Sequence, residues 1–319
     1  MSVRLPLRRQ IGQLLIAGLE GPELSAIERA WWNSIQPSGV ILFRRNIEEA
    51  QQTHQLLHGI NLLSAATPFR CVDLEGGLVD RFRDLIAPMP SVAAVHATGK
   101  PALFRKHGHL IGHSARLLGF NTTLAPVLDL ALPESQPVMR TRVTSPDPAE
   151  VIRYASAFLD GLAGEDILAC GKHFPGLGAG ALDSHQAMPV IRRSWEDLWH
   201  FDLAPYRALR ARLPLVMIAH AAYPTVTDDM TPASISPFWI AEVLQRRIRY
   251  SGLILSDDME MGGILTQASI EDAAVAAIAA GTHLLEICKD AALVIRAFEA
   301  LLRDAQAHPE GNQSKAGHE

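Results

Sequence analysis

Residues 167–189 read ILACGKHFPGLGAGALDSHQAMP, an apolar run followed by a long polar segment. The run ILAC is typical of a strand buried on both faces. The segment after it combines one lysine, one aspartate and two histidines with four glycines and two prolines, and Gly and Pro interrupt helices and strands alike. Because ordering so many glycines costs conformational entropy, such a loop usually serves a function. We therefore expect it to carry the ionisable groups of a functional site.

Apolar runs like this one recur along the chain and alternate with amphipathic segments. The runs are rich in Val, Ile and Leu with little alternation, as in parallel strands covered on both faces. The predicted strands are residues 14–19, 39–43, 69–73, 123–130, 167–174, 215–221, 253–256 and 283–288. The predicted helices are residues 48–64, 102–118, 148–163, 195–212, 237–249, 270–280 and 291–305. Asp147-Pro148 and Ser236-Pro237 mark two helix starts, each with an N-cap residue before a proline.

Eight strands alternating with helices over about 300 residues predict an α/β fold, a single-domain TIM-like (β/α)8 barrel. We place this domain at residues 1–306 and expect residues 307–319 to form a disordered tail. The first apolar run could instead belong to a helix. A doubly wound open sheet is the structural alternative, but no glycine-rich phosphate motif follows an early strand.

The composition is that of a globular protein with a sizeable core. The 319 residues are 48% hydrophobic and 20% charged, and the net charge is −5. A negative chain without a basic tract is not expected to bind nucleic acid or an acidic membrane.

The cysteines and the N-terminus indicate a cytoplasmic protein. The three cysteines, Cys71, Cys170 and Cys288, lie far apart in apolar runs, which predicts buried thiols in a reducing compartment rather than disulfides. The N-terminal apolar run, residues 11–19, is short and is broken by Gln13 and Gly18. It lacks a signal-peptide cleavage pattern. No run reaches the roughly 20 residues that a membrane-spanning helix needs.

Polar side chains occur where several predicted strands end. Asp73 and Glu75 lie at the end of the third strand, Lys172 and His173 at the end of the fifth, His220 at the end of the sixth, and Asp257-Asp258 at the end of the seventh. In (β/α)8 barrels the chemistry lies at the carboxyl ends of the strands. Packing does not explain such a cluster of ionisable groups, so we expect an active site there.

The pair Asp257-Asp258 holds one more carboxylate than a turn requires. Asp is a common turn residue, and this role accounts for one of the two, Asp258. The other, Asp257, would end the strand inside the barrel mouth. A carboxylate there could act as a nucleophile, a general base or a metal ligand.

The loop contains a second candidate pair, Asp183 and His185. A carboxylate two residues from an imidazole can orient the ring and raise its pKa, and a histidine exchanges protons near neutral pH. Asp183 could equally form an Asx turn beside an exposed His185. The residues alone leave both interpretations open.

The remaining candidates are Lys172, Asp73 and four arginines. Lys172 at a strand end would be a costly buried charge without a partner, which favours an anionic or hydroxyl-rich ligand. Asp73 and Arg81 could hydrogen-bond sugar hydroxyl groups. By spacing alone, Arg81 and Arg83 are better explained as an ordinary solvated helix face. Arg140 and Arg142 remain undecided by spacing.

Four motifs in order resemble glycoside hydrolase family 3. They are DLEGG with a following RF at residues 73–82, KHFPG at 172–176, DSH at 183–185 and SDD at 256–258. More narrowly, the chain is similar to the single-domain bacterial β-N-acetylglucosaminidases (β-N-acetylhexosaminidases) of peptidoglycan recycling. The similarity extends over nearly the whole chain. The resemblance implies a TIM-like barrel and a retaining mechanism with a covalent glycosyl-enzyme intermediate.

The resemblance also assigns roles to residues. Asp257 matches the nucleophile, His185 the unusual general acid/base, and Asp183 its partner. The residues that match those holding the terminal sugar are Asp73, Arg81, Arg142, Lys172 and His173. Arg142 is preferred to Arg140 because it keeps the family's five-residue spacing to Asp147. The resemblance implies a small carbohydrate or muropeptide substrate and neither a metal nor a cofactor.

The sequence departs from the family pattern at two positions. The family usually has His at position 177 and Arg at position 78, whereas this chain has Leu at both. Both changes put apolar groups near the expected sugar site, so the preference for the sugar or the aglycone could differ from that of the family.

Other functions are compatible with parts of the pattern. A glycosidase for another sugar, or a phosphorylase, fits the same motifs, because His185 would repel an anionic acceptor less than a carboxylate does. A metal-dependent hydrolase could use Asp257 with His173, His185 and His220, although these three histidines are not closely spaced in the sequence. Leu78 and Leu177 suggest a non-catalytic sugar-binding protein, but binding alone does not need Asp257, Asp183 and His185 together, so their joint presence argues against it.

Overall fold

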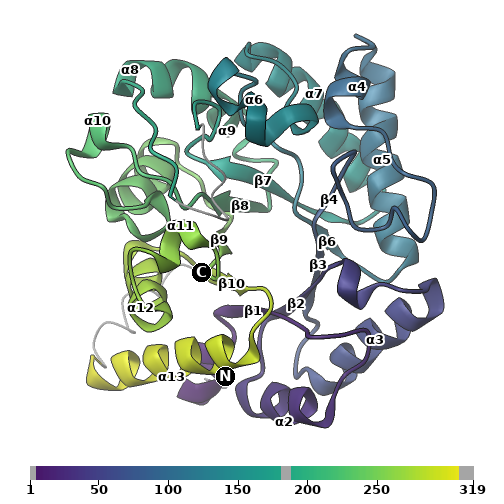
Figure 1. The fold of residues 1–319 in the computed structure, drawn as a ribbon, viewed down its shortest axis with the longest axis vertical. Helices are drawn as coiled ribbons and strands as arrows, with labels where there is room; N and C mark the ends of the chain where they lie inside the picture. Colours follow the sequence, from purple (N-terminus) through teal and green to yellow (C-terminus); the bar gives the residue numbers. More distant parts are fainter. Residues whose placement is uncertain (1–4, 181–187, 309–319) are drawn as a thin grey trace.

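The computed structural model describes residues 5–180 and 188–308. In this part of the chain, eight parallel strands close into a barrel in the order β1-β10-β9-β8-β7-β6-β3-β2, with the helices arranged around it (Figure 1). The strands are β1 (Leu15–Gly18), β2 (Gly39–Leu42), β3 (Phe69–Val72), β6 (Thr122–Thr123), β7 (Leu168–Phe174), β8 (Leu215–Ile218), β9 (Leu253–Asp258) and β10 (Leu284–Ile287). The predicted (β/α)8 barrel is confirmed, and the first apolar run is a strand.

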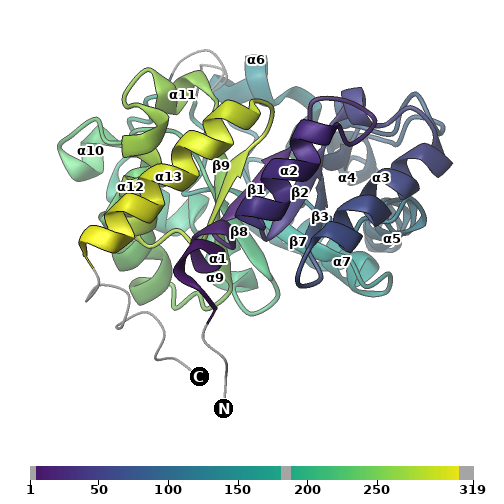
Figure 2. The same ribbon diagram turned by 90° about the horizontal axis from the view of Figure 1, so that it is seen from below.

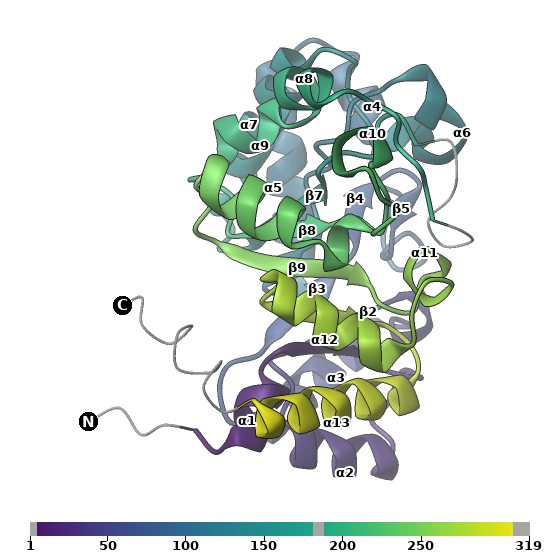
Figure 3. The same cartoon turned by 90° about the vertical axis from the view of Figure 1, so that its left-hand side faces the viewer.

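The outer layer consists of helices of very different lengths. The α-helices are α1 (Leu7–Gly12), α2 (Ala26–Ile35), α3 (Ala50–Leu63), α4 (Val92–His96), α5 (Pro101–Leu117), α6 (Gln136–Met139), α7 (Pro148–Ala163), α8 (Trp195–Asp197), α9 (Ala204–Leu209), α10 (Pro224–Thr227), α11 (Gly262–Leu265), α12 (Ile270–Ala280) and α13 (Ala291–Ala307). Figures 2 and 3 show that α6 and α11 lie at one end of the barrel and α1 at the other. Because α11 follows β9, the end with α6 and α11 is the one where the strands terminate.

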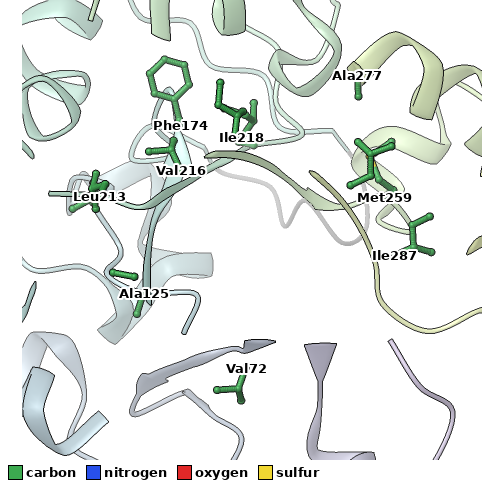
Figure 4. Close-up of a cluster of buried hydrophobic side chains, with 14 of the residues drawn as sticks. Val72, Ala125, Phe174, Leu213, Val216, Ile218, Met259, Ala277 and Ile287 are labelled. Atoms are coloured by element: carbon green, nitrogen blue, oxygen red, sulfur yellow. The ribbon is translucent and has the colours of Figure 1, made fainter. Parts of the chain in front are cut away.

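Side chains alternate between the two faces of each strand, so one set packs inside the barrel and the other packs against the helices. In β8, Leu215 and Met217 join the cluster inside the barrel, whereas Val216 and Ile218 join the layer between the strands and the helices. Figure 4 shows Val216 and Ile218 close to Phe174 of the neighbouring β7. Covering the strands on both faces explains why their sequences read as nearly continuous apolar runs.

The fourth barrel strand is shorter than the sequence predicts. β6 pairs with its neighbours only at Thr122–Thr123, whereas the prediction covered residues 123–130. Pro126 has no N–H group to continue the ladder. The chain nevertheless stays beside β7, because the N–H of Lys172 donates to the carbonyl of Pro126 (3.2 Å) and the N–H of Leu128 donates to the carbonyl of Lys172 (2.7 Å). Asp129 thereby reaches the end of β7.

The helices differ from the predictions in several places; for example, the helix predicted at residues 237–249 is a π-helix at Phe238–Arg247. Residues 195–212 form α8, a π-helix at Leu198–Asp202 and then α9, rather than one helix. Pro205 in the first turn of α9 explains the break, because proline removes a hydrogen bond of the helical ladder. The unpredicted α2 has a signal in the sequence, since the side chain of Ser25 accepts from the Glu28 N–H in a capping box.

The three cysteines are buried and unpaired, as predicted. In the part of the chain that the structure describes, every helix is too short or too polar to cross a membrane.

Candidate active site

A cavity of about 540 Å³ lies at the end of the barrel where the strands terminate. Six residues predicted for the site lie in described segments, and all of them line this cavity: Asp73, Arg81, Arg142, Lys172, His173 and Asp257. Asp73 directly follows β3, Lys172 and His173 belong to β7, and Asp257 belongs to β9. Closure of the barrel therefore brings together side chains that are up to 184 residues apart in the sequence (257 − 73).

Lys172 lies at the centre of a buried ionic network. Its Nζ is 2.5 Å from Oδ1 of Asp73 and 2.7 Å from Oε1 of Glu75. Arg142 donates to both carboxylate oxygens of Glu75, from Nη2 at 2.8 Å and from Nε at 2.9 Å. Arg81 donates from Nη2 to Oδ2 of Asp73 at 2.9 Å. The protein itself supplies the partners of Lys172, so its burial does not require an anionic ligand.

The pKa shifts in this network follow from its charges. Burial alone would raise the pKa of Asp73, but Lys172, Arg81 and Arg142 hold that pKa well below its usual range. Burial alone would lower the pKa of Lys172, but Asp73 and Glu75 raise it above its usual value. All of these groups are therefore charged at neutral pH. Two carboxylates face three cations, and their geometry is set before a ligand binds.

A tight hairpin brings Arg81 into the cavity. It consists of β4 (Leu74–Gly76) and β5 (Val79–Asp80). Gly76 has a φ of +90°, and a Cβ atom at this position would lie 2.3 Å from the carbonyl oxygen of Pro90. Only glycine fits such a backbone without strain. The solvated helix face favoured by spacing alone is thus wrong for Arg81, which lies beyond this hairpin against Asp73.

His173 is oriented by Asp129, which follows the short β6. The Nδ1 atom of His173 is 2.7 Å from Oδ2 of Asp129. Oδ1 of the same carboxylate accepts from the N–H of Leu177 at 2.7 Å. With Nδ1 occupied in this way, Nε2 is the ring nitrogen left to bond a ligand. Asp129 is buried, and it also fixes the start of the glycine-rich loop through Leu177.

The two aspartates at the end of β9 have different environments. Asp257 lines the cavity, and its Oδ1 accepts from the N–H of Asp258 at 2.9 Å. Oδ1 of Asp258 accepts from the N–H groups of Glu260 (3.0 Å) and Cys288 (3.2 Å). Burial raises the pKa of Asp258 to about 7, and the neighbouring charges of Glu260 and Asp257 add to the effect. Asp258 thus closes a turn and ties β9 to the end of β10, as the turn interpretation expected.

His220 does not share the cavity with these residues. It is fully buried, and its Nδ1 is 2.7 Å from Oγ of Ser234 while its Nε2 is 3.0 Å from the carbonyl oxygen of Asp258. Both ring nitrogens are occupied, so neither is free to bind a metal ion. Among the described residues, no group of three or more His, Cys, Asp or Glu side chains is arranged to hold one.

The rim of the cavity is partly apolar. Leu78 and Leu177, where the family resemblance implies Arg and His, both line it. Leu78 is 44% exposed and Leu177 is buried. Arg140 also lines the cavity, beside Arg142. The two departures from the family pattern therefore border the space in which a sugar would lie.

The proposed acid/base pair, Asp183 and His185, lies outside the described residues. Gly180, the last described residue before this segment, lines the cavity. Met188, the first described residue after it, is buried.

The sequence interpretation omitted three site residues. Glu75 lies at the end of the third predicted strand, but the sequence assigns it no separate role in the site. Asp129 ends an apolar run, so the same strand-end argument could have found it. Glu286 lines the cavity from β10, and its signal is a lone charge inside the apolar run LLEIC.

Residues 6–313 match the family model described as the glycosyl hydrolase family 3 N-terminal domain. This chain belongs to glycosyl hydrolase family 3. It is 32% identical over 294 residues to a family relative named beta-hexosaminidase from Idiomarina loihiensis, an alignment that covers 91% of this chain and 88% of the relative. Like its family 3 relatives, the protein is a glycosidase.

Two solved family 3 structures are similar over most of the chain. A beta-N-acetylglucosaminidase from Paenibacillus sp. superposes with a TM-score of 0.91 at 31% identity, covering 95% of this chain and 59% of that one. NagZ from Neisseria gonorrhoeae in complex with N-trifluoroacetyl-D-glucosamine superposes with a TM-score of 0.83 at 30% identity, covering 92% and 89% of the two chains.

Proposed function

We propose that this glycosidase is a retaining β-N-acetylglucosaminidase that releases terminal β-linked N-acetylglucosamine from peptidoglycan-derived fragments. The observation that carries the proposal is one cavity containing both Asp257 and the ionic network around Lys172. The names of the relatives support the sugar, as does the glucosamine derivative bound to the Neisseria protein. The peptidoglycan origin of the substrate rests on the resemblance of the motifs.

In the proposed first step, a carboxylate oxygen of Asp257 attacks the anomeric carbon of the terminal sugar. The bond from this carbon to the leaving oxygen breaks, and a ring nitrogen of His185 gives that oxygen its proton. In the second step His185 takes a proton from water, whose oxygen displaces Asp257 from the anomeric carbon. Two displacements retain the configuration of the sugar. Asp183 would orient His185 through a hydrogen bond.

The ionic network is suited to hold the hydroxyl groups of the terminal sugar. Lys172, Arg81 and Arg142 present donors, and Asp73 presents acceptors, in positions fixed by the pairs among them. His173 adds its Nε2. Because these groups are already ordered, a ligand does not have to order them when it binds, and this favours affinity.

Leu78 and Leu177 favour a second candidate within the family. A cavity rim with apolar groups at these positions would suit a β-glycosidase for another sugar, or a phosphorylase for another acceptor. This candidate retains the barrel and the role of Asp257. It changes only the sugar or the molecule that takes up the glycosyl group.

The test is release of nitrophenol from the N-acetyl-β-glucosaminide and from the β-glucoside, with and without phosphate, in the presence of a chelator. We expect fast, phosphate-independent release from the acetamido sugar. Preference for the glucoside, or dependence on phosphate, would favour the second candidate. Loss of activity in the chelator would support a metal-dependent hydrolase, and no release from either sugar would support a sugar-binding protein.

Asp257→Asn tests the nucleophile in the same assay. Removing the attacking carboxylate should lower turnover by about 10,000-fold or more while sugar binding remains. Asp304→Asn on the exposed surface of α13 is the control and should behave like the wild type. Unchanged turnover in Asp257→Asn would contradict the assignment.

The cytoplasmic location and the disordered tail at residues 307–319 remain predictions. Cell fractionation checks the first and limited proteolysis of the purified chain checks the second. α13 itself extends to Ala307.

A further inference from the structure

Glu286 occupies a position inside the barrel that is otherwise apolar. It lies in β10, where Leu285 and Ile287 pack toward the helices and Leu284 and Cys288 join the cluster inside the barrel. Alternation along the strand therefore points Glu286 inward. Its side chain is 2% exposed and lines the cavity that contains Asp257. Glu286 thus puts a carboxyl group at the inner wall of the candidate active site.

Three cations of the cavity, Lys172, Arg81 and Arg142, are bonded to carboxylates other than Glu286. Lys172 pairs with Asp73 and Glu75, Arg81 pairs with Asp73, and Arg142 pairs with Glu75. Glu286 appears in none of these pairs. Its Oε1 is buried and has no hydrogen-bond partner among the described residues.

The charges around Glu286 are mostly negative. Asp257 and Asp258 of β9, Asp73 after β3 and Lys172 of β7 lie near enough for their charges to act on Glu286. Burial raises the pKa of Glu286 well above its usual value, the three aspartates add to this rise, and Lys172 opposes it. A carboxyl group accepts hydrogen bonds from hydroxyl groups, and in its protonated form it also donates one.

A buried polar atom without a partner is unfavourable unless a ligand or water satisfies it. The charges near Glu286 limit the chemical class of that ligand. An anionic ligand would meet the carboxylates of Asp257 and Asp73, whereas an uncharged hydroxyl group would not be repelled. A hydroxyl group can donate to a carboxyl oxygen and can also accept from a protonated carboxyl group.

We propose that Glu286 is a substrate-binding residue of this cavity, whose carboxyl group hydrogen-bonds one hydroxyl group of the terminal sugar. The inference rests on the proposed function and deepens it, because it adds a determinant of which sugar the cavity accepts. Glu286 acts in binding, beside the ionic network that holds the rest of the sugar.

The test measures binding by calorimetry in the Asp257→Asn protein, so that turnover does not interfere. The ligands are N-acetylglucosamine, glucose and their 3-, 4- and 6-deoxy analogues. Each is titrated into proteins that carry Glu286, Glu286→Leu or Glu286→Gln. Glu299→Leu on the exposed face of α13 is the matched control, and thermal unfolding confirms that each variant is folded.

We expect Glu286→Leu to weaken binding of the parent sugar by about 10- to 100-fold. One deoxy analogue, the one lacking the bonded hydroxyl group, should bind with equal affinity to the protein that retains Glu286 and to the Glu286→Leu variant. Glu286→Gln should restore most of the affinity, because its amide can also donate and accept. Unchanged binding, or an equal loss for every analogue, would overturn the proposal.

The outcome separates this inference from the proposed function. Binding of glucose without binding of N-acetylglucosamine would contradict the sugar assigned above, while the deoxy series of glucose still decides the role of Glu286. Conversely, tight binding of N-acetylglucosamine with an equal loss for every analogue would leave the function intact and remove Glu286 from it. Failure of both sugars to bind would overturn both.

Discussion

His185 is the residue whose proposed role depends most on the leaving group. A general acid matters when the departing oxygen is basic, and matters little when that oxygen leaves readily as an anion. Asp257 is needed with every substrate, because it forms the bond to the sugar in each case. Comparing substrates with different leaving groups therefore distinguishes the role of His185 from that of Asp257.

His185→Ala should slow cleavage of alkyl and disaccharide substrates by about 100- to 10,000-fold. Nitrophenyl substrates, whose leaving oxygen needs no proton, should lose much less in their first step. The measurement is kcat/KM for a series of aryl and alkyl glycosides. His308→Ala, near the end of the described chain, is the control. A uniform loss across the series would contradict the role of His185 as proton donor.

At the scale of the element, Asp258 links the ends of two neighbouring strands. Its Oδ1 bonds the N–H groups of Glu260 and Cys288, and so joins the turn after β9 to the end of β10. Its pKa of about 7 lies above the value near 3.9 expected in the unfolded chain. Between these values the folded protein holds a proton that the unfolded chain has released.

This shift predicts a pH dependence of stability. The contribution of Asp258 is fully present below about pH 4 and decreases by about 1.4 kcal/mol per pH unit until it is lost near pH 7. Asp258→Asn keeps the oxygen that accepts both N–H groups and removes the titration. The decrease in unfolding free energy from pH 5 to pH 8, measured with urea, should be smaller in this variant by up to about 3 kcal/mol. An equal decrease in both proteins would contradict the prediction.

For the whole molecule, the critical contact is the one that closes the barrel. The first strand, β1, pairs with the last, β10, in the register Leu15↔Leu285 to Ala17↔Ile287. Gly18 ends β1, and a Cβ atom there would lie 1.8 Å from the carbonyl oxygen of Cys288. The seam is therefore too tight for any side chain at this position.

Gly18→Ala should destabilise the protein by about 3 kcal/mol or more, because the backbone must separate at the seam. Gly21→Ala is the matched control, since a Cβ atom at Gly21 has nothing within 4 Å, and it should change stability by less than about 0.5 kcal/mol. Thermal or urea unfolding of both variants measures the difference. Equal stability of the two would show that the seam can widen without cost.

The sequence by itself determined the barrel of eight strands, the end of it that holds the cavity, and most of the charged side chains that line the cavity. These features depend on local patterns, since runs of apolar residues predict buried strands and polar residues mark their ends. Family motifs added Arg81 and Arg142, which spacing alone did not place.

Only the tertiary structure decided which charges meet. Lys172 pairs with Asp73 across 99 residues, and Arg142 pairs with Glu75 across 67. The partners of an ion pair are set by barrel closure and by the hairpin that carries Arg81, and no local pattern records them. The same closure leaves Glu286 buried without a cation. In the described part of the chain, Glu286 has no cation as a bonded partner because Lys172, Arg81 and Arg142 pair with Asp73 and Glu75.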